Sequence, residues 1–413
     1  MSRKLDETRS FLDLYFHICG ESEVPHSYNL WAGISLIAGA VADRVWFTKF
    51  HGKKLAPNLY VALIGPSANG KGEAIDTAVR LTLDHPKIAL YNGKASPQYL
   101  MSWMTRKRTL EDGTQVDCSK VYFVTPELSM ALGKGDSADA IIKHMTELYT
   151  GRAIPILDGT VTRGLQRLTD YCVNWLIGTT LEWLLETVPA SSISGGFFGR
   201  IIGVYEGYVR DRRVPVPKAP HDYDEVVAHL HARLTELVEI DGEFEMTPKA
   251  RMTMNEWYTS RDWPSDESLV PAFKRQDDLV LKLAMILSLA DDLGLVITAK
   301  HVLRAQTLSD SVLRKLGDIQ AAAATTPATR GIAFVQQYLK GMRRPIMRSE
   351  ILRRFVAKGL GDRDTLDIAL RTLEDSNTVV HRPTGRGTSY QWLGKRRLPK
   401  DEISNNGGPP ERD

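Results

Sequence analysis

Residues 61–72 read Val-Ala-Leu-Ile-Gly-Pro-Ser-Ala-Asn-Gly-Lys-Gly, an apolar strand followed by a glycine-bounded loop and a lysine. Glycines at both ends allow a loop to curl so that successive backbone N–H groups point at phosphate oxygens, and Lys71 adds a positive charge. The next residues, from Glu73 onward, predict a helix whose N-terminus faces the same anion. An ordinary strand-to-helix turn with a surface lysine is the alternative. The phosphate-binding interpretation assigns the nucleotide to Gly65, Pro66, Ser67, Ala68, Asn69, Gly70, Lys71, Gly72 and Glu73.

This loop differs from the usual motif at the position after the lysine. A Ser or Thr hydroxyl normally binds Mg²⁺ there, but this chain has Gly72. The glycines and Lys71 remain, so the change bears on hydrolysis more than on binding. Glu73, or water and phosphate oxygens alone, are the replacements that we expect for the metal ligand.

Later strands also end in residues that could do chemistry. The run from Val121 to Thr125 is rich in β-formers and leads to Glu127, a carboxylate suited to orient an attacking water. A core strand that ends in a surface glutamate is the alternative, and Pro126 stands where a second acidic residue is usual. The run from Val173 ends in the hydroxyls of Thr179 and Thr180, and Arg200 precedes a further strand over 201–205.

Composition indicates a globular chain. It has 413 residues, 43% of them hydrophobic and 25% charged, which allows two or three domains. The apolar stretch from Trp31 to Ala42 is too short to span a bilayer and predicts a buried helix. No charged segment followed by an apolar core opens the sequence, and the three cysteines have no pairing or metal spacing. We therefore expect a cytoplasmic protein with reduced cysteines and no membrane contact.

Positive charge gathers near the C-terminus. Residues 330–400 contain 16 Lys or Arg against six Asp or Glu, although the net charge of the whole chain is only +3. Such a basic module favours contact with nucleic acid, and a solvated basic face is the alternative.

The basic module has its own pattern of elements. It follows a small-residue stretch over 321–329 and predicts helices over 331–340, 349–358 and 362–375, then a hairpin over 378–393. Three helices and a hairpin are typical of a winged helix, which binds DNA or docks proteins. The DNA-binding interpretation assigns phosphate or groove contacts to Arg363, Arg371, Arg382 and Arg386, and the polar residues 395–413 predict a disordered tail.

The order of these motifs resembles a known family. A P-loop, an acid-tipped strand, a polar-tipped strand and a Gly-Phe-Phe-Gly-Arg element before a strand are similar to MCM-like AAA+ ATPases, in the branch of phage and mobile-element replicative helicases or primase-associated proteins. The apolar residues from Pro25 to Trp46 are similar to the helical segment that precedes the P-loop in that branch. The resemblance covers about residues 8–310 and implies an α/β fold with a helical N-terminal lead-in (1–55), an AAA+ core with a helical lid (56–320), a winged helix (330–394) and a tail (395–413).

The resemblance implies roles for single residues. Lys71 would contact the β- and γ-phosphates of ATP, Glu127 would be the catalytic base, and Thr180, or Thr179, would be the sensor-1 residue. Arg200 would be an arginine finger that reaches the nucleotide of a neighbouring copy, which implies a ring, as a hexamer. The sensor-2 residue would be Arg275 or Lys282.

A predicted hairpin over 154–163, with an Asp-Gly turn, lies between Glu127 and the sensor-1 strand. In MCM-like rings a hairpin at this place points into the central channel, so Arg163 and Arg167 would contact DNA; a solvated edge hairpin is the alternative.

These expectations combine into an ATP- and Mg²⁺-dependent DNA helicase that acts in phage or mobile-element replication, in the bacterial cytoplasm if phage-encoded, with a primase or another replication protein as partner. One alternative is an initiator or loader that binds ATP and DNA without hydrolysis. Another is a protein-docking adaptor with a vestigial P-loop.

Overall fold

The structure is a computed structural model with two compact units, residues 1–319 and 320–413. It describes residues 9–83, 85–93, 96–129, 136–149, 156–160, 164–187, 197–207, 214, 218–324, 327–342, 344–358, 360–376, 378–384 and 387–393.

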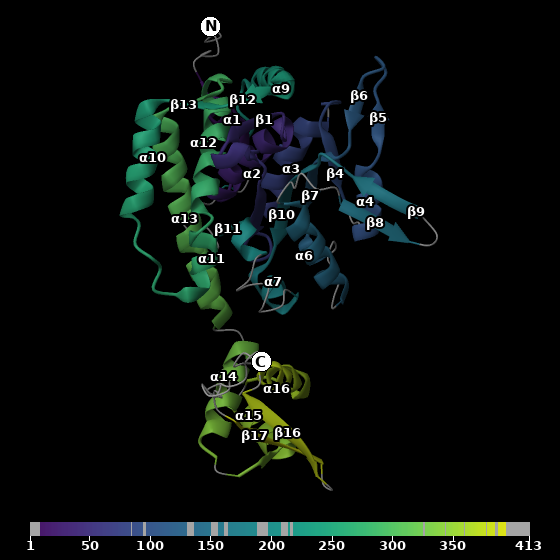
Figure 1. Ribbon diagram of the computed structural model, residues 1–413, viewed down its shortest axis with the longest axis vertical. Helices are drawn as coiled ribbons and strands as arrows, with labels where there is room; N and C mark the ends of the chain where they lie inside the picture. The colour runs from purple at the N-terminus through teal and green to yellow at the C-terminus, as the bar shows by residue number, and fades with distance from the viewer. Residues whose placement is uncertain are drawn as a thin grey trace, which may run out of the picture. The chain divides into compact units, whose positions relative to one another are not determined.

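A parallel sheet of five strands forms the centre of the first unit (Figure 1). Its order is β11-β3-β10-β7-β4. All the neighbouring pairs are parallel, so the carboxyl ends of the strands lie along one edge. The strands are β3 (Tyr60–Ile64), β4 (Ala89–Asn92), β7 (Lys120–Thr125), β10 (Cys172–Thr179) and β11 (Ile201–Tyr205).

Every residue of β3 and β10 is buried. The sequence of a parallel strand that is covered on both faces is a nearly continuous apolar run, and this pattern predicted the strands of this sheet. The α/β class and the strands expected at 61–64, 121–125, 173–180 and 201–205 are therefore confirmed.

Of the two N-terminal helices, α2 packs against this sheet and α1 packs against α2. Helix α1 (Phe11–Cys19) begins at a capping box in which Ser10 and Asp13 exchange hydrogen bonds. Helix α2 (His26–Val41) is the expected buried helix, and it lies so close to the sheet that a side-chain carbon at Gly39 would be 2.6 Å from the Tyr122 ring.

The lead-in is not wholly helical. Strands β1 (Val45–Thr48) and β2 (Lys54–Leu55) pair with each other, and β1 also pairs with β12 (Gly242–Glu243). Because that partner lies almost 200 residues later, tertiary pairing decides the structure of this short segment.

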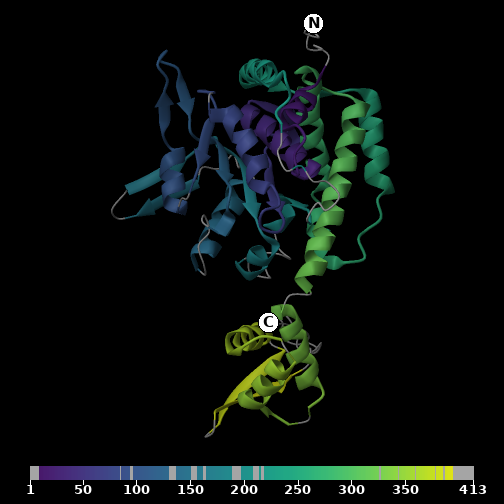
Figure 2. The same ribbon diagram turned by 180° about the vertical axis from the view of Figure 1, so that it is seen from behind.

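A group of helices follows β11. Figures 1 and 2 show α10, α12 and α13 side by side along one side of the unit, opposite the side from which strands β8 and β9 project. This region contains α9 (Tyr223–Glu239), α10 (Pro248–Ser260), α11 (Val270–Phe273), α12 (Gln276–Asp292) and α13 (Ala299–Ala324), with the short strands β13 (Glu245–Met246) and β14 (Val296–Ile297).

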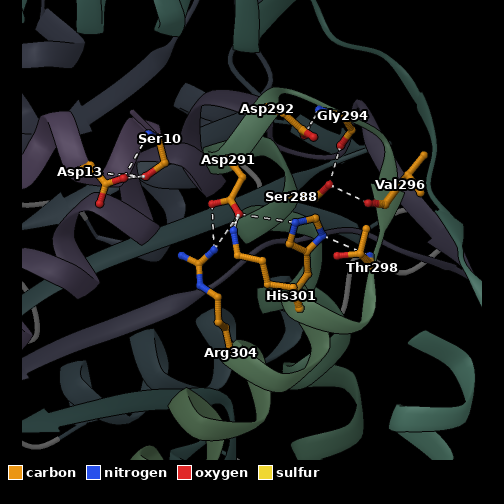
Figure 3. A network of polar contacts seen from close by, with 11 residues as sticks. Ser10, Asp13, Ser288, Asp291, Asp292, Gly294, Val296, Thr298, His301 and Arg304 are labelled. Carbon is orange, nitrogen blue, oxygen red and sulfur yellow. Dashed lines mark hydrogen bonds and ion pairs between the residues drawn. The ribbon is translucent and has the colours of Figure 1, made fainter. Parts of the chain in front are cut away.

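A polar network fixes the turn between α12 and α13 (Figure 3). Both carboxylate oxygens of Asp291 accept hydrogen bonds from Arg304, at 2.8 and 2.9 Å, and Lys300 donates a third at 3.0 Å. Burial raises the pKa of Asp291, but these donors and their charges outweigh it and hold the pKa below its ordinary value. The Ser288 hydroxyl donates to backbone carbonyls of the same turn. The beginning of α13 is therefore rigidly joined to α12.

The hairpin predicted over 154–163 forms with a different turn. Strand β8 (Ile156–Thr160) pairs with β9 (Gly164–Leu168), and Asp158 lies opposite Gln166 within the ladder. The turn is thus not at Asp158-Gly159, and that prediction is wrong. The observed register sets buried Leu168 opposite Ile156, and this packing prevails over the turn preference of Asp-Gly.

The first unit contains several further elements, of which α3 packs against α2 and β10 in the core. Strands β5 and β6 form a hairpin. Within the described residues, no helix is long and apolar enough to cross a bilayer. These elements are α3 (Lys71–Leu83), α4 (Pro97–Met104), β5 (Lys107–Thr109), β6 (Gln115–Asp117), α6 (Asp136–Leu148), α7 (Leu181–Thr187) and the 3₁₀ turns η1 (Phe50–Gly52), η2 (Phe198–Arg200) and η3 (Glu267–Leu269).

The second unit contains the three helices and the hairpin expected from the sequence. A short strand that the sequence did not indicate adds a third member to the sheet, whose order is β15-β17-β16. The predicted tail over 395–413 lies outside the described residues. The elements are α14 (Pro327–Lys340), β15 (Ile346–Met347), α15 (Arg348–Ala357), α16 (Arg363–Asp375), β16 (Val379–Thr384) and β17 (Gly387–Trp392).

Candidate nucleotide-binding site

The glycine-bounded loop lies at the carboxyl edge of the parallel sheet. Strand β3 ends at Ile64, residues 65–70 form the loop, and α3 begins at Lys71. The first N–H groups of a helix have no partner within the helix, so the start of α3 offers donors to an anion above the loop.

The loop backbone is curled through left-handed residues. Ala68 has φ 59° and Gly70 has φ 77°. At Gly70 a side-chain carbon would also lie 2.9 Å from Val24, so a left-handed backbone and lack of space both require glycine here.

Contacts from outside the loop hold it in place. The Asn69 side-chain amide donates to the backbone carbonyls of Glu206, at 3.2 Å, and Gly207, at 3.0 Å. The Tyr28 hydroxyl donates to the carbonyl of Ile64 at 2.6 Å. A side-chain carbon at Gly65 would lie 2.6 Å from the Glu206 carbonyl oxygen and closer still to the Tyr28 hydroxyl.

Lys71 is enclosed by the same loop. Its side chain is 8% exposed, and Nζ donates to the carbonyls of Gly65, at 2.8 Å, and Pro66, at 2.6 Å. Burial lowers the pKa of Lys71 below its ordinary value of 10.5, whereas the charges of Glu127 and Glu182 raise it. The structure thus places one cation inside the curl, with two carboxylates near enough to affect it.

Glu127 lies at the carboxyl edge of the sheet, two residues after β7, and is exposed. One of its carboxylate oxygens accepts a hydrogen bond from the Ser129 hydroxyl at 3.3 Å. The preceding residue, Pro126, brings its carbonyl against Gly178 of β10, where a side chain would collide with it. This close approach places Glu127 beside the end of β10.

The two threonines at the end of β10 have different surroundings. Thr179 pairs with Ile64, and its carbonyl accepts a hydrogen bond from the Gly65 N–H at 3.2 Å. The Thr180 hydroxyl accepts from the backbone N–H of Trp183 at 3.3 Å and so caps the start of α7. Thr179 therefore touches the loop directly, and Thr180 is the next residue along the same edge.

The usual protein ligands to Mg²⁺ are not replaced by a preformed cluster. Within the described ranges, no group of three or more His, Cys, Asp or Glu has the arrangement of a metal site. A side-chain carbon at Gly72 would meet no atom within 4 Å. The position after the lysine therefore has room for a side chain, which this chain does not supply. Glu73 is exposed in the first turn of α3.

Arg200 lies at the opposite end of the sheet from Lys71. It directly precedes β11, whose first residue pairs with Tyr60 at the start of β3. Burial raises the pKa of Tyr60, and the charge of Arg200 opposes that rise. In this register Arg200 is level with Leu59, and six steps of about 3.3 Å, roughly 20 Å along the strand, separate its backbone from Gly65.

The two sensor-2 candidates are also remote from the loop. An Arg275 guanidinium nitrogen would lie 2.7 Å from a side-chain carbon at Gly199, so Arg275 is next to Arg200. Lys282 is buried, and its Nζ donates to the Asn58 backbone carbonyl, at 2.8 Å, and to Asn58 Oδ1, at 2.7 Å. Because Asn58 precedes β3, the Lys282 ammonium holds the amino edge of the sheet together instead of facing the loop.

The residues expected to bind DNA are exposed where the structure describes them. These are Arg167 on β9, Arg363 and Arg371 on α16, and Arg382 on β16. Arg163 and Arg386 lie outside the described residues.

Three residues near the loop were not predicted from the sequence: Tyr28, Glu182 and Glu206. Tyr28 and Glu206 are far from the loop in the chain and become its neighbours only through packing. Glu182 does carry a signal, because it lies in the first turn after the polar-tipped strand β10, which is the neighbour of β3.

No protein-family model matches this chain, and comparison with curated proteins also found no match.

Two glycines of the loop provide a matched test of this geometry. We predict that Gly65→Ala destabilises the fold by about 1–3 kcal/mol, because its side chain meets the Glu206 backbone, which cannot move away cheaply. Gly72→Ala should leave the free energy of unfolding unchanged or raise it by up to about 1 kcal/mol, because that side chain enters open space in the first turn of α3. Urea unfolding measures both. Equal stabilities of the two variants would contradict the packing described for the loop.

Proposed function

We propose that this chain is an ATP-dependent, ring-forming DNA helicase of the AAA+ type, active in phage or mobile-element DNA replication. The observation that carries the proposal is the convergence of Lys71, Glu127 and Thr179 at one edge of a parallel sheet, around a curled loop that opens a helix. Ligands of open α/β sheets bind at the carboxyl ends of the strands.

The loop suits a triphosphate. Residues 65–73 would surround the phosphates with backbone N–H groups, and Lys71 would exchange its two carbonyl partners for β- and γ-phosphate oxygens. Glu127 would accept the proton of the attacking water, and Thr180 or Thr179 would orient that water.

Magnesium requires a different set of ligands from the usual one. Bound Mg²⁺ would supply neutralising charge to the phosphates. Glu73, the acidic residue in the first turn of α3, would be the protein ligand to Mg²⁺, and water and phosphate oxygens would complete the coordination shell.

Ring formation is supported by the position of Arg200. Arg200 and Arg275 lie together at the end of the sheet remote from Lys71. An arginine there cannot reach the nucleotide of its own loop, so it stabilises the transition state only from a neighbouring copy. A closed ring, a hexamer in this proposal, gives every copy such a neighbour.

DNA contact is assigned to the second unit and to the β8–β9 hairpin. In this proposal the second unit is a winged helix, which its helix-strand-helix-helix-hairpin order supports, and α16 and β16 expose Arg363, Arg371 and Arg382. Arg163 and Arg167 on the hairpin would grip single-stranded DNA in the ring channel, and Arg386 would join the wing contacts. Further partners in this proposal are a primase or another replication protein.

A second function is favoured by Gly72 and Pro126, which replace both usual protein ligands of Mg²⁺. It is a replication initiator or loader that binds ATP and DNA without hydrolysing ATP. Steady-state ATP hydrolysis with and without DNA separates it from the helicase.

Removal of the loop cation tests nucleotide binding. We predict that Lys71→Met abolishes binding of a fluorescent ATP analogue, because no other side chain in the loop offers a positive charge. Lys300→Met, which removes an exposed lysine from α13, should bind as the parent does. Fluorescence titration gives both affinities. If Lys71→Met binds the analogue as tightly as the parent, residues 65–72 form an ordinary turn.

Mixing of two inactive variants tests the ring. Arg200→Ala should keep ATP affinity but lower hydrolysis by about 10³-fold, because the arginine acts on charge that develops in the transition state of a neighbour. Mixing it with Lys71→Met should restore part of the hydrolysis, since some interfaces then join an intact loop to an intact arginine. A mixed ring that stays inactive at every ratio, with assembly verified by mass photometry, would disprove the action in trans.

Charge removal in the second unit tests DNA contact. The triple substitution of Arg363, Arg371 and Arg382 by Gln should weaken duplex binding and flatten the slope of log K against log salt by about 0.9 for each lost phosphate contact. Arg314→Gln, on α13 of the first unit, serves as the control. An unchanged salt slope in the triple variant would mean that this charge serves solubility or a protein partner.

A further inference from the structure

Glu206 directly follows β11 and is contacted by four separate elements. Its backbone faces the nucleotide loop, while its side chain faces two helices. The mechanism proposed above uses none of these contacts.

The backbone of Glu206 is part of the wall of the loop. Its N–H donates to the Ile64 carbonyl at 3.0 Å, and its carbonyl accepts from the Asn69 amide at 3.2 Å and the Tyr28 hydroxyl at 3.4 Å. Gly65 packs against the same carbonyl with no room for a side chain. Any shift of residues 65–69 must therefore move the Glu206 backbone or break these contacts.

The side chain of Glu206 connects the wall to two helices. Oε1 accepts a hydrogen bond from the Ser27 hydroxyl of α2 at 3.0 Å and lies 3.4 Å from Lys315 Nζ of α13. The two charged side chains are 29% and 34% exposed, so the pair is partly shielded from water.

Helix α13 also packs directly on β11. A side-chain carbon at Gly203 would lie 3.0 Å from Ile319, which is fully buried. The helix continues to Ala324 and thus carries the chain out of the first unit. Lys315 lies one turn before Ile319 on α13 and is paired with Glu206, the residue that follows the last residue of β11.

We infer that Glu206 is a positioning residue that couples the nucleotide loop to α13 through its ion pair with Lys315, a role that rests on the proposed nucleotide function. When nucleotide enters, Lys71 leaves the carbonyls of Gly65 and Pro66, and the loop adjusts around the phosphates. Asn69 and Gly65 transmit that adjustment to the Glu206 backbone. The ion pair transmits it to the second half of α13, the element that leads to the basic unit.

Hydrogen exchange of the full chain, with and without adenylyl imidodiphosphate, tests this coupling. We expect the nucleotide analogue to slow exchange in residues 309–319 of the parent. Glu206→Gln and Lys315→Met should still bind the analogue, about two- to fivefold more weakly, but exchange in 309–319 should no longer respond to it. Lys315→Arg keeps the charge and should retain the response.

The control is Lys300→Met, which removes a lysine of α13 that lies far from Lys315 along that helix and pairs with Asp291 of α12. It should respond as the parent does. Thermal unfolding of each variant separates loss of coupling from loss of stability, and Lys315→Arg keeps the test informative if Lys315→Met is unstable.

The outcomes are distinguishable. A parent that binds the analogue without slower exchange in 309–319 overturns the coupling but leaves nucleotide binding intact. A normal response in Glu206→Gln and Lys315→Met shows that the ion pair carries no coupling. A parent that binds no analogue overturns both the proposed function and this inference.

Discussion

Close contact at Gly65 is the constraint on which the rest of the site depends. Because this residue has no side chain, the end of β3 can lie against the Tyr28 hydroxyl and the Glu206 carbonyl at once. Those contacts fix where the loop leaves the sheet, and Asn69 fixes where it turns. Lys71 is then enclosed by the loop carbonyls, and α3 begins at the same residue.

The parallel sheet gives the unit two chemically different edges. Its carboxyl edge holds Lys71, Glu127 and Thr179, and its amino edge holds Arg200 and Lys282. Since strand length keeps the edges apart, a residue at the amino edge serves either the fold, as Lys282 does, or a neighbouring molecule, as we propose for Arg200. Glu206 follows β11 at the carboxyl edge, beside the loop, and forms an ion pair with Lys315, so it connects the loop to α13.

Sequence patterns predicted the features that depend on local residues. Buried parallel strands are nearly continuous apolar runs, so β3, β7, β10 and β11 could be located, as could the loop before α3. Features that depend on tertiary packing were missed. The β8–β9 turn follows the packing of Leu168 instead of the Asp-Gly preference, the strands β1 and β15 are too short to show a pattern, and nothing near Tyr28 or Glu206 in the chain points to residue 65. The contact between the Lys282 ammonium and Asn58 was also missed, because a helix position alone does not reveal such a partner.

Electron cryomicroscopy of the full chain with a slowly hydrolysed ATP analogue and a forked DNA tests the central claim most directly. The account predicts a closed ring with phosphates held by residues 65–73, and Arg200 of the adjacent copy directed at the γ-phosphate. Nucleotide bound elsewhere, or an ordered loop in which Lys71 still faces the Gly65 and Pro66 carbonyls at saturating analogue, would contradict it.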